Sequence, residues 1–267
     1  MKDLSTLYPV WLCDLWGVVH DGHQPFATAV DALIRHRRNG GKVVFITNAP
    51  RPRAEIDIYL DQMGVPRETY DDMVTSGDVT RELILEHGSQ GLYHMGTEED
   101  LAIFKGLAVK PVGLDQASAV LCTGFKDDVE RGRAEIDHPL LEQCKARGLP
   151  MICANPDKVV RIAGRLMACA GLIAEVYEQM GGEVLMAGKP FTPIYDMTMK
   201  QAGHPDRSKV LAIGDGPDTD VKGAAQNGLP CVFISGGINT HSDPETNVRS
   251  RYPAARIIKV SPELVWA

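Results

Sequence analysis

The sequence predicts an α/β fold: a doubly wound, Rossmann-like core with a parallel sheet, interrupted in sequence by an inserted second domain. Short, almost continuous apolar runs alternate with amphipathic stretches near both ends of the chain, and a more mixed region lies between them. Such runs suit strands covered on both faces, and their alternation with helices is typical of parallel βαβ units. We therefore expect a core domain of residues 1–77 and 183–267 and an inserted domain of residues 78–182.

The N-terminal part of the chain supplies the first two strands and helices. The run "VWLCDLWGVV" (10–19) predicts a strand, and "KVVFITNAP" (42–50) predicts a second strand that ends in a polar turn. Between them, residues recur at helical spacing from Ala29 to His36, and "NGG" ends that helix. Another amphipathic helix is expected over residues 51–63, and "GVP" directly after it marks its end.

The rest of the chain continues this alternation. Strands of the middle region are expected at "GLYHMG" (91–96), "SAVLCTGF" (118–125) and "PMICANP" (150–156), with a helix near residues 127–147. Later strands are expected at "EVLMAGKP" (183–190), "KVLAIGDG" (209–216) and "PCVFISGG" (230–237). Helical stretches separate these last three, so we expect them to rejoin the parallel sheet of the core.

Composition excludes several classes of function. The 267 residues are 44% hydrophobic and 24% charged, with a formal net charge of −7, which gives no electrostatic reason for binding nucleic acid or an anionic membrane. The six cysteines lie far apart without a C-x-x-C pair, so buried reduced thiols are expected rather than a zinc site or disulfides. Asp14 interrupts the apolar segment at residues 8–19, unlike a signal peptide or membrane span, so a cytoplasmic protein is expected.

Polar side chains stand where the predicted strands end. In an open parallel sheet, ligands bind beyond the carboxyl ends of the strands, so these groups should converge on one crevice. They are Asp14, Thr47, Asn48, Lys189 and the acidic run of Asp215, Asp218 and Asp220. Mg²⁺ prefers oxygen ligands, a carboxylate can attack phosphorus, and a lysine and a hydroxyl can stabilise the phosphoryl oxygens. The set therefore suits phosphoryl chemistry with Mg²⁺.

Each of these residues also has a structural explanation. An Asp at a strand end is often a turn or capping residue, "TNAP" is good turn chemistry, and Asp220 could be the N-cap of a helix that begins at Val221. A calcium EF-hand loop fits poorly, because Lys222 stands where the sharp turn needs a glycine. The segment "AGKP" lacks the earlier glycine and the following Ser or Thr of a phosphate-binding Walker loop.

Taken in order, these segments resemble the four motifs of the haloacid dehalogenase (HAD) superfamily, class IIA, the NagD-like phosphatases. The motifs are "DLWG" (14–17), "ITNAP" (46–50), "GKP" (188–190) and "GDGPDTD" (214–220). The segment "ANPD" (154–157) and the stretch that follows it resemble the end of the α/β cap in this class. The resemblance covers essentially the whole chain and implies that the inserted domain is an α/β cap of the class IIA type.

The resemblance implies a role for each motif residue. Asp14 would be the nucleophile and a Mg²⁺ ligand, Thr47 and Asn48 would bind the transferred phosphoryl group, and Lys189 would hold nucleophile and phosphate together. Asp215 would bind the metal, and Asp220 would do so directly or through water. Candidates for contact with the substrate are Arg161 and the loop at residues 168–171, with Gly171. Cap-to-cap homodimers are common among similar proteins, but the sequence leaves the oligomeric state open.

Trp16 departs from the pattern of the family, whose phosphatases usually carry a second Asp at this position. Its backbone carbonyl can still bind the metal, but an indole cannot serve as general acid and base, and losing such a group typically costs on the order of 10²- to 10⁴-fold in rate. The substrates could have good leaving groups, His20 or Asp21 could carry the proton, or the substrate could supply its own acceptor. Trp16 could also simply pack against the cap.

Two classes of function remain. The first is a Mg²⁺-dependent phosphatase that hydrolyses a small cytosolic metabolite, such as a sugar phosphate or nucleotide, through an aspartyl phosphate. The second is a protein that binds a phosphorylated ligand with little or no turnover. A nucleotide-cofactor oxidoreductase is disfavoured because no G-x-G-x-x-G follows the first strand. Dehalogenation, which attacks carbon, has no need of the metal-binding acids.

Overall fold

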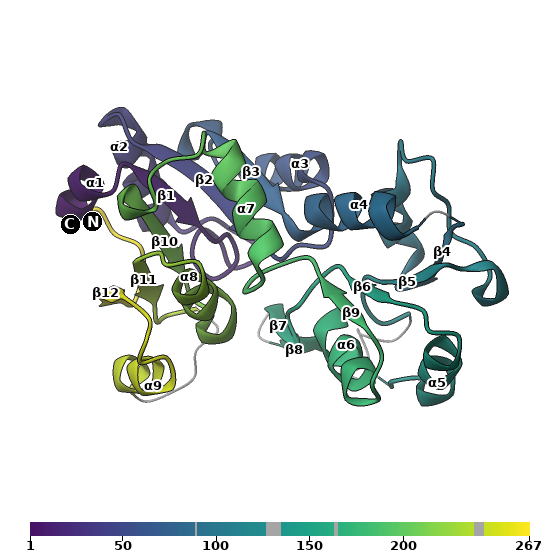
Figure 1. Cartoon of the computed structure of the whole chain (residues 1–267). Helices are drawn as coiled ribbons and strands as arrows, with labels where there is room; N and C mark the ends of the chain where they lie inside the picture. Colours follow the sequence, from purple (N-terminus) through teal and green to yellow (C-terminus); the bar gives the residue numbers. More distant parts are fainter. Residues whose placement is uncertain (89, 127–134, 163–164, 238–242) are drawn as a thin grey trace. The chain divides into compact units, whose positions relative to one another are not determined.

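A computed structural model of the chain describes residues 1–88, 90–126, 135–162, 165–237 and 243–267 (Figure 1). The chain divides into two compact units. The terminal unit comprises Met1–Thr47, Ala54–Val74 and Lys189–Ala267, and the inserted unit comprises Asn48–Arg53 and Thr75–Gly188.

The terminal unit is built on a six-stranded sheet with the order β12-β11-β10-β1-β2-β3. Its strands are β1 (Val10–Cys13), β2 (Lys42–Thr47), β3 (Asp72–Thr75), β10 (Val210–Gly214), β11 (Cys231–Ile234) and β12 (Ile257–Ser261). The central strand β1 pairs in parallel with β10 on one side and β2 on the other. Every residue of β1 and β10 is buried, as expected for parallel strands covered on both faces.

Helices alternate with the strands of the terminal unit. They are α1 (Lys2–Leu7), α2 (Ala27–Arg38), α3 (Arg53–Met63), α7 (Thr192–Gln201), α8 (Lys222–Gln226) and α9 (Pro244–Arg251). Helix α2 buries the residues whose spacing predicted it, from Ala29 to His36. Its last residue is Arg38, Asn39 is its C-cap, and Gly40 follows with a φ of 83°, so the predicted helix and its "NGG" end are confirmed.

The inserted unit has its own four-stranded parallel sheet, in the order β4-β5-β6-β9. These strands are β4 (Leu92–Met95), β5 (Ala119–Cys122), β6 (Met151–Cys153) and β9 (Val184–Met186). Its helices are α4 (Ser76–His87), α5 (His138–Ala146) and α6 (Ala170–Gln179), and β7 (Val159–Ile162) and β8 (Arg165–Ala168) form an antiparallel pair.

Alternating side chains of the inserted sheet enter two separate hydrophobic cores. On β5, Val120 and Cys122 pack with residues of α5 and α6, whereas Ala119 and Leu121 pack with Ile84 of α4. Successive residues of a strand point to opposite faces of its sheet, so helices cover both faces of the inserted sheet. The prediction of an α/β fold with parallel sheets is therefore confirmed.

Two sequence-based expectations differ from the structure, and a third falls partly on residues that the structure does not describe. The strand at residues 183–190 exists as β9, but it pairs with β6 of the inserted sheet rather than with the sheet of the terminal unit. The first strand ends at Cys13, so residues 14–19 are not part of it. The described part of the helix expected near residues 127–147 is α5, and residues 127–134 lie outside the described residues. Strands β3 and β12 and the β7–β8 pair were not expected.

Two further expectations concern membranes and thiols. In the part of the chain that the structure describes, no helix has the length and apolar character needed to cross a bilayer. All six cysteines are buried and free of disulfides, as the sequence predicted.

Candidate active site

Strand register brings two aspartates together at the carboxyl ends of β1 and β10. Cys13 is paired with Ile213, and the amide of Asp14 donates a hydrogen bond of 2.9 Å to the carbonyl of Ile213. Asp215 follows β10 directly, so both carboxylates leave neighbouring strands at the same edge of the sheet. Carboxylate oxygens of Asp14, Asp215 and Asp220 all lie within 4.8 Å of one another, and all three residues are buried.

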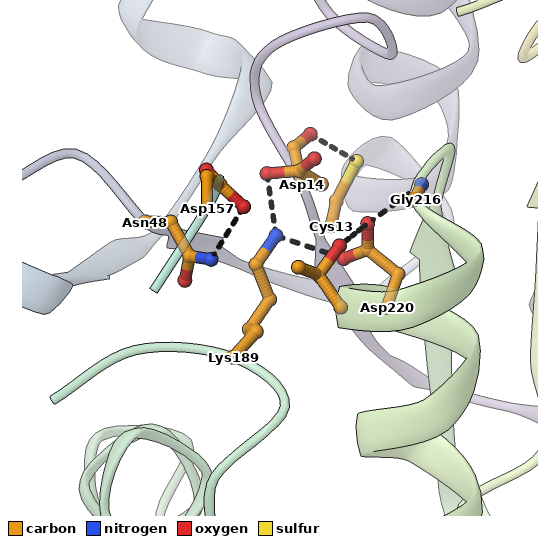
Figure 2. A network of polar contacts seen from close by, with 8 residues as sticks. Cys13, Asp14, Asn48, Asp157, Lys189, Gly216 and Asp220 are labelled. Carbon is orange, nitrogen blue, oxygen red and sulfur yellow. Dashed lines mark hydrogen bonds and ion pairs between the residues drawn. The ribbon is translucent and has the colours of Figure 1, made fainter. Parts of the chain in front are cut away.

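Lys189 lies between two of these carboxylates (Figure 2). Its Nζ is 2.7 Å from Oδ1 of Asp14 and 2.8 Å from Oδ1 of Asp220, and its side chain is only 2% exposed. Burial lowers the pKa of the Lys189 ammonium, but the neighbouring carboxylates of Asp14 and Asp220 outweigh burial and raise this pKa above its ordinary value. Lys189 is therefore a fixed positive charge at neutral pH.

A single helical turn, Pro217–Val221, holds Asp220 in place before α8 begins. Oδ2 of Asp220 accepts hydrogen bonds from the amide of Gly216 at 3.0 Å and from Oγ1 of Thr219 at 3.3 Å, while Oδ1 contacts Lys189. Groups of the protein thus bind both oxygens of this carboxylate, which favours contact of Asp220 with a metal through water rather than directly.

Asp215 is enclosed by two glycines that the sequence reasoning did not single out. A Cβ on Gly17 would lie 2.2 Å from Oδ2 of Asp215, and a Cβ on Gly237 would lie 1.9 Å from the same oxygen. Gly17 also has a φ of 78°, a conformation that other residues rarely adopt. In the sequence, the signals that could have identified them are the glycine that ends "DLWG" and a glycine soon after β11.

The charges of the site favour a cation. Burial raises the pKa of Asp14, and the carboxylates of Asp220 and Asp215 raise it further, although Lys189 lowers it. Among the described residues, the ammonium of Lys189 contacts two of three buried carboxylates that lie this close together, so one positive charge is shared by two negative ones. Clustered carboxylate oxygens are the donors that Mg²⁺ selects, so the residues present fit a magnesium ion.

Trp16 lies in a tight loop that follows Asp14. Its ring makes an edge contact with the ring of His20, with centroids 5.2 Å apart and planes at 74°. A Cβ on Gly22 would lie 2.5 Å from the Trp16 ring, so the indole rests directly on the backbone of this loop. Backbone bridges of His20 with Trp16 and with Pro25 close the loop.

His20 and Asp21, the alternative proton carriers, are both engaged in holding this loop. His20 is buried, its Nδ1 accepts a hydrogen bond of 3.1 Å from the amide of Gly22, and burial lowers its pKa to about 4. Oδ1 of Asp21 accepts from the amides of His23 and Gln24, both at 2.9 Å, and these bonds lower the pKa of Asp21. Neither pKa is tuned toward neutral pH, where an efficient general acid should titrate.

Thr47 and Asn48 were expected to act together, but the structure places them in different units. Thr47 is the last residue of β2 and is buried in the terminal unit. Asn48 opens the first segment of the inserted unit, and its Nδ2 donates a hydrogen bond of 3.0 Å to Oδ1 of Asp157 (Figure 2). Phosphate binding by each residue stays a prediction, and the partnership with Asp157 was not foreseen.

The two candidates for substrate contact lie in the inserted unit. Arg161 belongs to β7, opposite Leu166 of β8, and its side chain lies outside the described residues. Gly171 lies in the first turn of α6, where its amide donates a hydrogen bond of 3.1 Å to the carbonyl of Asp157. A Cβ on Gly171 would lie 2.2 Å from the carbonyl oxygen of Pro156, so close packing explains this glycine, and substrate contact stays a prediction.

Comparison with known proteins adds to this geometry. A family model described as haloacid dehalogenase-like hydrolase matches residues 11–110, and a HAD-hydrolase-like model matches residues 186–259. A solved hydrolase of the haloacid dehalogenase-like family from Brucella suis 1330 is 41% identical to this chain, with a TM-score of 0.87. That match covers 99% of this chain and 98% of the other.

Two further matches come from Mycobacterium tuberculosis. A D-glycerol 3-phosphate phosphatase is 26% identical over 290 residues, which covers 100% of this chain and 77% of the relative. A solved glycerol phosphate phosphatase in complex with magnesium has a TM-score of 0.75 at 22% identity, covering 99% of this chain and 77% of that one. At 22% identity, this solved structure shows that the two proteins share a fold.

Proposed function

Because the chain belongs to the haloacid dehalogenase-like hydrolase family, we propose that it is a Mg²⁺-dependent phosphatase that hydrolyses a small phosphorylated metabolite through an aspartyl phosphate. One observation carries the proposal: a buried lysine joins Asp14 to Asp220, and a third carboxylate, Asp215, lies within 4.8 Å of both. The assignment of the terminal unit as core domain and the inserted unit as cap domain belongs to the same proposal.

Asp14 would be the nucleophile. Its carboxylate attacks phosphorus, the bond between phosphorus and the leaving oxygen breaks, and water then hydrolyses the acyl phosphate to free Asp14 and inorganic phosphate. The ammonium of Lys189, 2.7 Å from Asp14, offsets the negative charge of the phosphoryl oxygens. The hydroxyl of Thr47 would hold one of these oxygens at the end of the neighbouring strand β2.

Three groups are proposed to hold Mg²⁺: the carboxylate of Asp14, the carboxylate of Asp215 and the backbone carbonyl of Trp16. When bound, the ion would supply positive charge that offsets the phosphate and orients it for in-line attack. Asp220, whose two oxygens are held by Lys189, Gly216 and Thr219, would act through water. Gly17 and Gly237 leave the space that Asp215 needs in order to reach this position.

Protonation of the leaving group bears on the class of substrate that we propose for this site. The indole N–H of Trp16 does not ionise near neutral pH, and the low pKa values of His20 and Asp21 leave neither poised to protonate a leaving group. We therefore expect the enzyme to favour phosphate esters whose leaving groups depart without a proton, or substrates that supply this proton themselves. The D-glycerol 3-phosphate phosphatase among the relatives points to a small polyol or sugar phosphate as the substrate class. The alkoxide leaving group of such an ester needs a proton, so the substrate would have to supply that proton itself or be turned over slowly.

Binding of a phosphorylated ligand without turnover is the second candidate, and Trp16 is the observation that favours it. Purified protein with Mg²⁺ and 4-nitrophenyl phosphate, an ester with an activated leaving group, separates the two functions. Release of phosphate that is lost in Asp14→Asn supports the phosphatase. Saturable binding of inorganic phosphate without release from the ester would support the binding protein.

A further inference from the structure

The chain passes between its two units next to two residues of the proposed site. It leaves the terminal unit between Thr47 and Asn48, and it returns for the last time between Gly188 and Lys189. The proposed phosphate-binding hydroxyl and the buried ammonium are therefore each bonded directly to a residue of the inserted unit. The position of each group depends on how firmly its neighbour in the chain is held.

Inside the inserted unit, the residues at these crossings pack tightly against one another. A Cβ on Gly188 would lie 2.4 Å from Oδ1 of Asn48, 2.7 Å from Cδ of Pro156 and 2.9 Å from Oγ of Ser76. Ser76 lies beside another crossing, which falls between Val74 and Thr75. Segments that are remote in sequence thus meet at one well-packed point of this unit.

Asp157 connects this point to the rest of the inserted unit. Its Oδ1 accepts the hydrogen bond from Nδ2 of Asn48 at 3.0 Å, across 109 residues of sequence. Its amide donates to Oδ1 of Asn155 at 3.0 Å, and its carbonyl accepts from the amide of Gly171 in the first turn of α6 at 3.1 Å. The Asp157 backbone is therefore anchored to α6, and its carboxylate holds Asn48, which is only 5% exposed.

We propose that Asp157 is a positioning residue for the phosphatase reaction: through Asn48 it fixes the peptide that follows Thr47, and it thereby aims the Thr47 hydroxyl at the transferred phosphoryl group. This inference rests on the proposed function. A buried amide that loses its hydrogen-bond acceptor carries a desolvation penalty, so its side chain shifts toward another partner. Small displacements of a positioning group lower the rate strongly, by about 100-fold per ångström in sensitive cases.

The test compares Asp157→Ala, which removes the acceptor, with Asp157→Asn, whose Oδ1 can still accept from Asn48. With 4-nitrophenyl phosphate and Mg²⁺, we expect Asp157→Ala to lower kcat/KM by about 10- to 100-fold and to weaken binding of inorganic phosphate as well. Asp157→Asn should recover most of both losses. Asp137→Ala is the matched control, because it removes an aspartate of the same unit that caps the exposed start of α5 and is not bonded to Asn48.

A double-mutant cycle with Thr47→Ala decides how Asp157 acts. If it acts through Thr47, Asp157→Ala costs little more in the Thr47→Ala background, because the group that it positions is already gone. Additive losses would overturn the proposal, since Asp157 would then act by a route that does not involve Thr47. A loss that varies with the leaving group while affinity for inorganic phosphate is unchanged would also overturn it, since Asp157 would then act on the leaving-group part of the substrate. Thermal unfolding identifies a variant that fails to fold, and Asp157→Ser, too short to reach Asn48, then replaces Asp157→Ala in the cycle.

Failure of the proposed function gives a different result. If wild-type protein binds inorganic phosphate with Mg²⁺ but releases none from the ester, the phosphatase assignment fails. Calorimetric titration of inorganic phosphate into wild type, Asp157→Ala and Asp157→Asn then still decides the positioning role. Equal phosphate affinity in all three would refute that role without reference to turnover.

Discussion

The rings of Trp11 and His36 stack face to face inside the terminal unit, with centroids 3.7 Å apart and planes 5° from parallel. His36 is completely buried, and its Nδ1 lies 2.7 Å from Oγ of Ser5. A Cβ on Gly41 would lie 2.3 Å from the imidazole, so the ring is also enclosed from this side. Burial lowers the pKa of His36 to about 4 from an ordinary value of 6.5.

Stability should therefore depend on pH. The unfolded chain binds a proton at His36 more tightly than the folded chain does. The stability that neutral His36 contributes is therefore complete above about pH 6.5 and is lost as the pH falls toward about 4. We expect His36→Phe, which keeps an aromatic ring beside Trp11, to reduce the loss of unfolding free energy between about pH 7 and about pH 5 by on the order of 1–2 kcal/mol. Urea unfolding at both pH values measures this, and an identical pH dependence in wild type and variant would contradict it.

Gly17→Ala should weaken Mg²⁺ binding without unfolding the protein. The new methyl group would lie 2.2 Å from Oδ2 of Asp215, so the carboxylate has to move away. We expect apparent Mg²⁺ affinity to fall by about 10-fold or more, a typical effect when a group that orients a metal ligand is disturbed. Gly40→Ala is the matched control: its φ of 83° imposes similar backbone strain, but nothing lies within 4 Å of its Cβ. Equal Mg²⁺ affinity in the two variants would show that the methyl group does not reach Asp215.

Lys189→Met should lower both turnover and stability, because it leaves Asp14 and Asp220 buried beside each other without their shared ammonium. Breaking a buried ion pair by removing one partner typically costs about 3–5 kcal/mol. Lys158→Met is the control: Lys158 lies 2.6 Å from Glu175, but its side chain is 56% exposed, and exposed pairs contribute about 1 kcal/mol or less. Mg²⁺ should partly restore the stability of Lys189→Met, which denaturant unfolding with and without the ion would measure. Equal losses in the two lysine variants would contradict this account of the site.

Trp16→Asp should change which substrates are turned over. An Asp two residues after Asp14 could protonate the leaving oxygen, so hydrolysis of alkyl phosphates should rise relative to that of 4-nitrophenyl phosphate. The ratio of kcat/KM for the two esters is the measurement, and Trp16→Phe, which keeps a ring against His20 and Gly22, is the control. If the ratio is unchanged in a correctly folded Trp16→Asp protein, the side chain at this position has no part in proton transfer.

Local patterns in the sequence predicted most of the terminal unit. The apolar runs that became β1 and β10 are buried on both faces, and their ends placed Asp14 and Asp215 correctly at one edge of the sheet. The sheet to which β9 belongs was predicted wrongly, since a strand of only three residues, Val184–Met186, carries no pattern that identifies its partner. Short strands are placed by tertiary packing, which local periodicity does not describe.

The contacts of the candidate site likewise divide into those that the local sequence predicts and those that depend on tertiary packing. Residue type and position at a strand end were enough to bring Asp14 and Asp215 together. Lys189 does reach Asp14, but the strand before it belongs to the other sheet, so the reasoning that placed this lysine at the edge of the core sheet was wrong. The bond from Asn48 to Asp157 spans 109 residues, and no local spacing predicts such a pairing. The space that Gly17 and Gly237 provide for Asp215 likewise depends on the close approach of backbone segments from different parts of the chain.

The pairing of β9 with β6 determines where this protein could be recombined with a relative. A chimera that exchanges the inserted unit with a junction before Val184 would combine a foreign sheet with a native edge strand, and the side chains along that pairing would no longer match. A junction between Gly188 and Lys189 keeps the four strands together, although Gly188 and Asn48 must then come from the same parent because they pack against each other. The junction for exchanging the inserted unit therefore lies after β9.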